Sequence, residues 1–174
     1  MVETLLLDQL PDGVTSREYT VLAAACGLTR DANKARKFWN LAVAAAPKHS
    51  VTFCFSARGL ALFDFDLRND PESGRTRFQQ AIDSISDGTD TAHELAADTY
   101  IVWIRALHRY NPASPDLNEL RVKLGEELAA IQHWGRRAEI EARMGALLSV
   151  LDISEGTRQS KPQPGSDSAV NSDS

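Results

Sequence analysis

Apolar residues over the first 153 positions recur at intervals of three and four, the spacing of one face of an α-helix. Short breakers rich in Gly, Pro, Asn and Asp divide this pattern into stretches of about 12 to 20 residues, a usual length for globular helices. No stretch shows sustained alternation of β-branched and polar residues, as a half-buried strand would. The pattern therefore predicts an all-α fold of about seven helices, preceded by a short apolar N-terminal segment.

Several of the predicted helices carry their own start signals. Thr15 or Ser16 stands before a helix with Glu18 in its first turn, which is typical of an N-terminal cap. Asp70-Pro71-Glu72 places a proline at the first helical position, and Ser114-Pro115-Asp116 stands before another apolar stretch. Helix starts are therefore predicted at these three places.

The segment from Ser154 onward changes in composition and becomes rich in Ser, Pro, Asn and Asp. Such a segment lacks the apolar side chains whose burial would offset the entropy lost on ordering. We therefore expect one helical domain over residues 1–153 and a disordered Ser/Pro-rich tail over residues 154–174.

Eight residues between Ser16 and His49 place small and aromatic side chains on one stripe of each of two helices. They are Tyr19, Leu22, Ala23 and Cys26, then Ala35, Trp39, Ala42 and Pro47. Small residues let two helices approach closely, and the aromatic rings fill the space beside them. The spacing resembles the tetratricopeptide repeat, a unit of about 34 residues with W-x2-L-G-x2-Y in its first helix and A-x3-F, then Pro, in its second.

A second window is similar to the same repeat, with two departures. It is carried by Phe55, Gly59 and Leu62, then Gly74, Phe78 and Ala81. Arg58 stands where the repeat usually has leucine, and the interval from Gly59 to Gly74 is about three residues longer than the repeat allows. We expect the extra residues to enlarge the loop between these two helices.

The rest of the helical pattern is similar to the repeat only in architecture. A long helix reaching about Tyr110 is followed by one with apolar residues from Leu120 to Ile131, and a last helix is expected from about Arg136 to Asp152. The last helix suits the capping helix that terminal repeats need.

The resemblance implies a short right-handed α-solenoid of antiparallel helix pairs, with a concave groove lined by the first helix of each pair. Proteins of this family bind a partner peptide or helix in that groove. The family's geometry implies groove positions at Arg17, Thr20, Phe53, Ser56, Leu60, Phe63, Glu94, Asp98 and Arg105, with Ala24, Thr91 and Ile101 beside them. Thr20 and Ala24 stand where some family members carry the Lys and Asn that clamp a terminal carboxylate, so we expect a ligand with an apolar anchor.

Charge and composition bear on the partner and the compartment. The formal charge of -5 and a pI near 5.4 give no attraction toward nucleic acid or anionic lipid. Residues 1–8 lack the positive charge and long apolar run of a signal peptide. We therefore expect a cytoplasmic chain that binds another protein or peptide, neither nucleic acid nor membrane, with Cys26 and Cys54 as reduced core residues.

The sequence contains one motif whose residue pattern resembles that of an enzyme active site. The run from Leu62 to Leu67 resembles the first motif of haloacid-dehalogenase-like phosphatases, which carry two aspartates at the end of a strand. It lies some sixty residues into a chain with no predicted sheet, so a helix end with solvated acids fits it better. The four histidines have no metal-ligand spacing and no nucleophile motif occurs. We expect no catalysis, no metal and no cofactor.

Two alternatives to a non-catalytic interaction or scaffolding module remain open. Residues 14–22 resemble the opening of response-regulator-type helix-turn-helix domains, and residues 33–37 supply some of the cations that a recognition helix needs. Phe38, Trp39 and Pro47 fit a packed second helix better. The chain could also be a self-associating structural protein that hides its groove by forming a homodimer.

Overall fold

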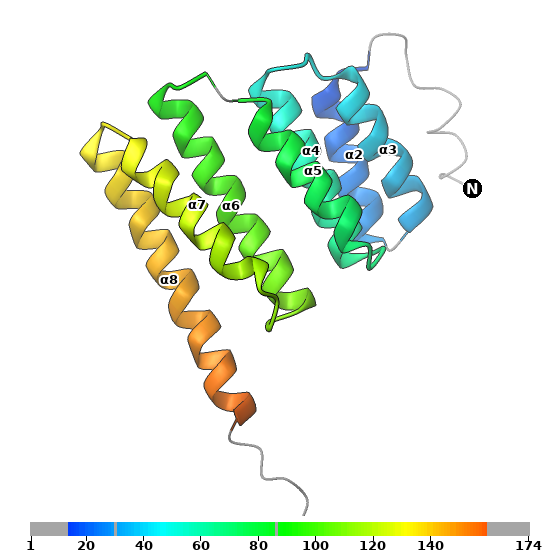
Figure 1. Cartoon of the computed structure of the whole chain (residues 1–174). Helices are drawn as coiled ribbons and strands as arrows, with labels where there is room; N and C mark the ends of the chain where they lie inside the picture. The colour runs from blue at the N-terminus through cyan, green and yellow to red at the C-terminus, as the bar shows by residue number, and fades with distance from the viewer. Residues whose placement is uncertain (1–13, 30, 86, 160–174) are drawn as a thin grey trace, which may run out of the picture.

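The computed structural model describes residues 14–29, 31–85 and 87–159 of the chain (Figure 1). All regular structure in these residues is helical, and no strand occurs among them, which confirms the all-α prediction and the expected seven helices. The expected N-terminal apolar segment and residues 160–174 of the expected tail lie outside the described residues. The helices are α2 (Ser16–Leu28), α3 (Ala32–Ala45), α4 (Val51–Asp66), α5 (Pro71–Asp83), α6 (Asp90–Tyr110), α7 (Asp116–Ala130) and α8 (Trp134–Gln159).

Two of the predicted start signals act as the sequence indicates. The Thr15 backbone N–H donates to the Glu18 carboxylate over 2.7 Å, and the Glu18 N–H donates to the Thr15 hydroxyl, which completes a capping box at α2. At α5 the Asp70 carboxylate accepts from the Ser73 N–H over 3.1 Å, and Pro71 is the first helical residue. Both boundaries are therefore determined by hydrogen bonds between near neighbours in the sequence.

Helix α7 begins at Asp116, as predicted, but no side chain caps it, and the last helix ends later than the predicted Asp152. Ser114 does not cap α7 with its side chain; it is buried, and its carbonyl accepts from the Leu117 N–H over 3.2 Å instead. The last helix runs to Gln159, so the boundary expected at Ser154 lies inside α8. The sequence after Asp152 loses its apolar pattern but contains residues such as Glu155 and Arg158, which have a high intrinsic preference for the helix.

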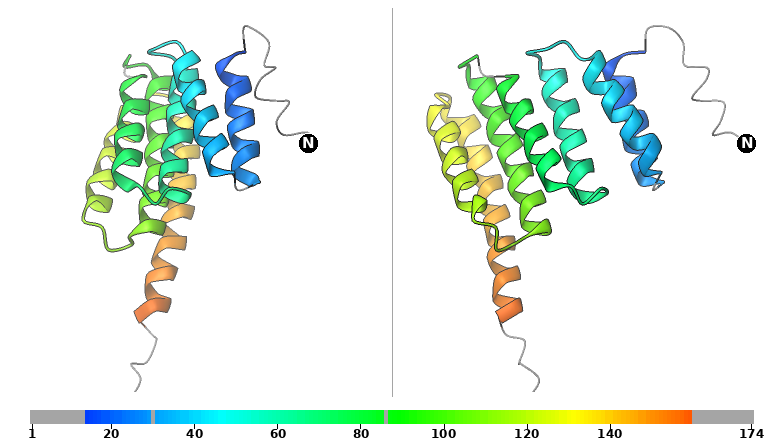
Figure 2. Two further views of the ribbon diagram at one scale, coloured as in Figure 1. Left: turned by 90° about the vertical axis from the view of Figure 1, so that its right-hand side faces the viewer. Right: turned by 45° about the vertical axis from the view of Figure 1, so that its right-hand side comes forward.

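Each helix packs against the next helix in the chain. The even-numbered helices α2, α4, α6 and α8 also contact one another in that order. The most extensive contacts are between α2 and α3, between α4 and α5, and between α6 and α7, while α3 also packs on α4 and α5 on α6. Contacts between α2 and α4, α4 and α6, and α6 and α8 place these four helices side by side (Figure 1 and Figure 2). The faces that α4, α6 and α8 leave uncovered are therefore neighbours in space.

The larger part of the core is built around Phe78 of α5, which is fully buried. Its ring centroid lies 6.0 Å from that of Phe65 in α4 and 5.4 Å from that of Trp103 in α6, against which it stacks. A smaller cluster of Ala35, Leu60 and Phe63 joins α3 to α4. Aromatic and aliphatic contacts thus connect consecutive helices from α3 to α6.

The loop between α4 and α5 is not enlarged as the sequence predicts. Residues 67–70 join these helices, only one residue more than the linker 29–31 between α2 and α3. The interval from Gly59 to Gly74 is long for a different reason, which the packing of α4 explains.

Candidate functional site

Three of the four groove positions predicted on α4 are buried inside the fold. Leu60 and Phe63 are 2% and 4% exposed and pack with Ala35 of α3. Ser56 is 1% exposed, and its hydroxyl lies 3.0 Å from that of Ser16 in α2. The prediction that Ser56, Leu60 and Phe63 line an open groove is therefore wrong, because this face of α4 is covered by α2 and α3.

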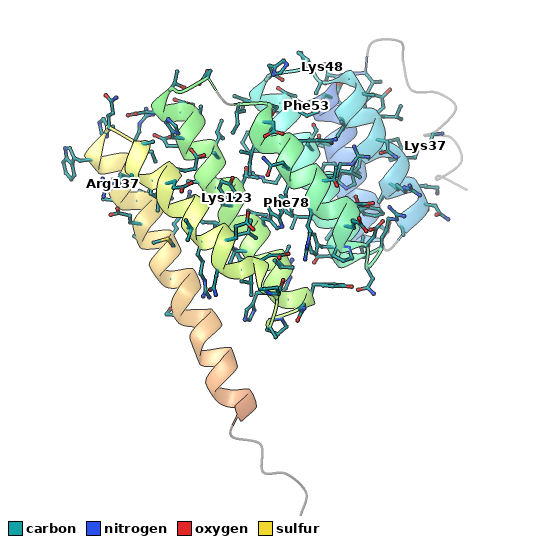
Figure 3. The ribbon with its side chains drawn as sticks, in the orientation of Figure 1. Lys37, Lys48, Phe53, Phe78, Lys123 and Arg137 are labelled. Atoms are coloured by element: carbon teal, nitrogen blue, oxygen red, sulfur yellow. The ribbon has the colours of Figure 1, made fainter. Side chains whose placement is uncertain are left out.

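The fourth predicted position on α4, Phe53, is half-buried and packs against the main core. It lines a cavity of about 390 Å³ together with Val43 of α3 and Arg77 of α5, and Figure 3 labels it beside α5. Phe53 therefore belongs to the side of α4 that faces α3 and α5, away from the predicted groove residues of α6.

The predicted positions on α4 are buried because α4 packs two residues out of register with the predicted repeat pattern. A Cβ placed on Gly74 would lie 3.2 Å from the carbonyl oxygen of Ala61, so Ala61 is the residue at which α4 and α5 approach closely. Gly59 instead meets the ring of Trp39 in α3, at 2.2 Å from an added Cβ. Ala61, and not Gly59, is therefore the position in α4 that corresponds to Ala23 in α2. Helix α4 continues for five residues beyond Ala61, and α2 continues for five residues beyond Ala23. The linker therefore supplies only one extra residue.

The surface of α4 that remains uncovered carries Val51, Phe55 and Arg58, with half-buried Leu62 on the same helical stripe. Val51 is 46% and Phe55 42% exposed, and the guanidinium carbon of Arg58 lies 4.7 Å from the centroid of the Phe55 ring. Moving the predicted positions 53, 56 and 60 forward by two residues gives Phe55, Arg58 and Leu62. The sequence alone does not single these residues out, because Gly59 and Ala61 are both small candidates for the point of close approach.

The three groove positions predicted on α6 face α8. Glu94 accepts from Arg136 over 3.0 Å, and Asp98 forms an ion pair with Arg143, so both half-buried acids connect α6 to α8. Arg105, two turns beyond Asp98, is exposed. The structure therefore brings these three residues onto one side of α6, with two of them already paired within the chain.

A cavity of about 470 Å³ opens between α4, α6 and α8. It unites two predicted groove residues of α6 with an unpredicted residue of α4 and two of α8. Its lining consists of Arg58, Asp98, Ile101, Val102, Arg105, Arg143 and Ala146. We call this lining together with Phe55 the arginine groove.

The two positions predicted on α2 do not line the arginine groove. Arg17 is exposed, while Thr20 is half-buried, donates to the Ser16 carbonyl over 3.0 Å and lies 3.4 Å from the Ser56 hydroxyl. Thr20 therefore belongs to the contact between α2 and α4, and Arg17 stands on the outer surface of α2.

The aspartates of the phosphatase-like motif, Asp64 and Asp66, lie in a helix. Asp64 is 3% exposed and accepts from the Arg68 guanidinium over 3.0 Å, and Asp66 pairs with Arg109 over 2.9 Å. Both acids belong to the last turns of α4, so neither stands at the end of a strand. In the part of the chain that the structure describes, no three His, Cys, Asp or Glu side chains gather as a metal site, and no helix suits a bilayer crossing.

Burial raises the pKa of Asp64 above its ordinary 3.8, although the Arg68 guanidinium opposes the shift. The folded chain therefore holds this proton more tightly than the unfolded chain, and ionised Asp64 is unfavourable above the raised pKa. Asp64→Asn is expected to increase the free energy of unfolding at pH 7 and to lose that advantage as the pH falls through the raised pKa toward 3.8. Urea unfolding of both proteins from pH 7 to pH 3 measures the difference, and a gap that stays constant or widens in acid would contradict the assignment.

Comparison of the chain with protein-family models, with curated proteins and with solved structures finds no match. The resemblance to the tetratricopeptide repeat stays a prediction from residue spacing.

Proposed function

We propose that the chain is a non-catalytic interaction module, a short tetratricopeptide-like stack of antiparallel helix pairs that binds a peptide or helix of another protein. The observation that carries this proposal is the arginine groove, a cavity of about 470 Å³ between α4, α6 and α8 with the exposed Phe55 at its side. The direct contacts of α4 with α6 and of α6 with α8 support it, since a stack aligns alternate helices along one surface.

The lining of the arginine groove favours a peptide over a small metabolite. Its volume is also that of a small-molecule pocket, but the exposed Phe55 extends its apolar surface beyond the cavity. Ile101 and Val102 supply an apolar floor, while arginines stand at the sides. A segment that inserts one apolar side chain and lies across neighbouring helices uses all of these features.

We further propose that the protein is cytoplasmic and needs no cofactor. Its partner is neither nucleic acid nor membrane, because the net charge of -5 gives no general attraction to either. The homodimer and the helix-turn-helix regulator stay as alternatives. Self-association through the arginine groove would give an adduct of the chain with itself in the experiment below.

Photo-crosslinking in the native cell tests the proposal. Benzoylphenylalanine replaces Phe55 in one variant and Val122 of α7, which is 61% exposed, in a matched control. We expect irradiation to give discrete adducts with another protein at position 55 and not at position 122. The same adducts at both positions, or none at position 55, would contradict binding at the arginine groove.

A further inference from the structure

The arginine groove concentrates positive charge in an acidic chain. Three of its lining residues are arginines and one is an aspartate, whereas the whole chain carries a net charge of -5. Arg143 forms an ion pair with Asp98. The uncompensated charge of the arginine groove therefore comes from Arg58 and Arg105.

Arg58 and Arg105 have no ion-pair partner among the residues that the structure describes. The Arg58 guanidinium lies over the Phe55 ring, with its carbon 4.7 Å from the ring centroid. Stacking of this kind leaves the N–H groups at the edge of the guanidinium plane able to donate. Arg105 is exposed and lines the same cavity from α6. Two cationic donors therefore flank the apolar floor from two different helices.

The floor between these arginines is apolar. Ile101 and Val102 of α6 and Ala146 of α8 line it, and no described acid other than the paired Asp98 is part of the lining. An acidic peptide with an apolar anchor matches both features, because its carboxylates can take bidentate hydrogen bonds from arginine. Nucleic acid fits less well, because it carries no aliphatic side chain that could insert against Ile101 and Val102.

We propose that the partner segment is acidic. One apolar side chain inserts against Ile101 and Val102, and Asp or Glu residues beside it pair with Arg58 and Arg105. This inference rests on the proposed function, because it names the chemistry of the segment that the arginine groove binds.

The experiment measures the charge preference of the full chain by fluorescence anisotropy. The probes are labelled helical peptides of about four turns that share leucine anchors on one face and differ only in flanking residues, which are all Glu, all Gln or all Lys. We expect binding to weaken in the order Glu, Gln, Lys. The affinity for the Glu peptide should fall as salt is added, as partly exposed ion pairs require.

Variants assign the preference to the two arginines. The double substitution Arg58→Gln and Arg105→Gln is expected to lower the affinity for the Glu peptide about tenfold, which is the effect of losing two partly exposed ion pairs. The affinity for the Gln peptide should stay unchanged. The matched control is Lys37→Gln with Lys48→Gln, which removes the same charge from positions outside the arginine groove (Figure 3). It should preserve the order Glu, Gln, Lys.

The outcomes separate this inference from the proposed function. If the three peptides bind equally, and Phe55→Ala weakens all of them, the groove binds peptides but the acidic partner is wrong. If no peptide binds, and benzoylphenylalanine at position 55 gives no adduct with another protein in the cell, the proposed function fails as well. A duplex oligonucleotide that binds more tightly than the Glu peptide, or a chain whose dimerisation is lost in the double arginine variant, also overturns the acidic partner.

Discussion

Phe78→Ala is expected to lower the free energy of unfolding by about 3–5 kcal/mol, the usual cost of removing a fully buried aromatic ring. Phe78 contacts Phe65 of α4 and stacks on Trp103 of α6, so its loss opens a cavity where three helices meet. Urea unfolding followed by circular dichroism at the helix band measures the change. A single transition at lower urea is expected.

Phe55→Ala is the matched control for this prediction. It removes the same side chain from the neighbouring helix α4 at a position that is 42% exposed. The expected change is within about 1 kcal/mol, as for other surface substitutions. Equal losses in the two variants, or a loss below about 1 kcal/mol for Phe78→Ala, would contradict the central place of Phe78 in the core. If the Phe55→Ala variant is stable, it can also be used in the binding experiments.

Gly74→Ala is expected to lower the free energy of unfolding by about 1–3 kcal/mol, although alanine favours a helix more than glycine does. An added Cβ would lie 2.5 Å from the Phe65 ring and 3.2 Å from the Ala61 carbonyl oxygen. The Phe65 ring is buried against Phe78 and Tyr110, and the backbone oxygen can move only if α4 and α5 separate. Thermal and urea unfolding both measure the loss.

Gly125→Ala provides the opposite result in the same experiment. Gly125 is exposed on α7, and an added Cβ there meets nothing within 4 Å. The substitution is expected to stabilise the chain by up to about 1 kcal/mol, because only the backbone preference for alanine acts. If both variants gain stability, α4 and α5 do not approach at Gly74 as closely as the structure indicates.

The sequence predicts those boundaries that depend on neighbouring residues. The capping box at Thr15 and Glu18 and the Asp70 cap use hydrogen bonds across three positions, so their signal is local. Ser114 shows the limit of such signals, because the fold buries it and satisfies the helix start with its carbonyl.

The rotation of α4 about its own axis could not be predicted with the same certainty. Gly59 and Ala61 are both small, and either can serve as the point of close approach in a repeat-like pattern. The choice is made by residues far away in the sequence, Trp39 against Gly59 and Gly74 against Ala61. An error of two residues in a helix turns the predicted face by more than half a turn, which explains why Ser56, Leu60 and Phe63 are buried.

The candidate site could be predicted only in part for a related reason. Asp98 and Arg105 were accessible to prediction because α6 has the expected face. The contribution of Arg143 depends on where α8 packs, and an isolated helical pattern does not contain that information. The positive charge of the arginine groove is likewise a property of three helices together.

The central claim is that helix pairs stack so that α4, α6 and α8 share one surface, and nuclear Overhauser contacts between aromatic rings test it most directly. The structure predicts contacts between Tyr19 and Phe38 within the first pair, between Phe65 and Phe78 within the second, and between Phe78 and Trp103 from the second pair to the third. Contacts within the pairs but none between Phe78 and Trp103 would show that the second and third pairs do not stack, and the arginine groove would not exist.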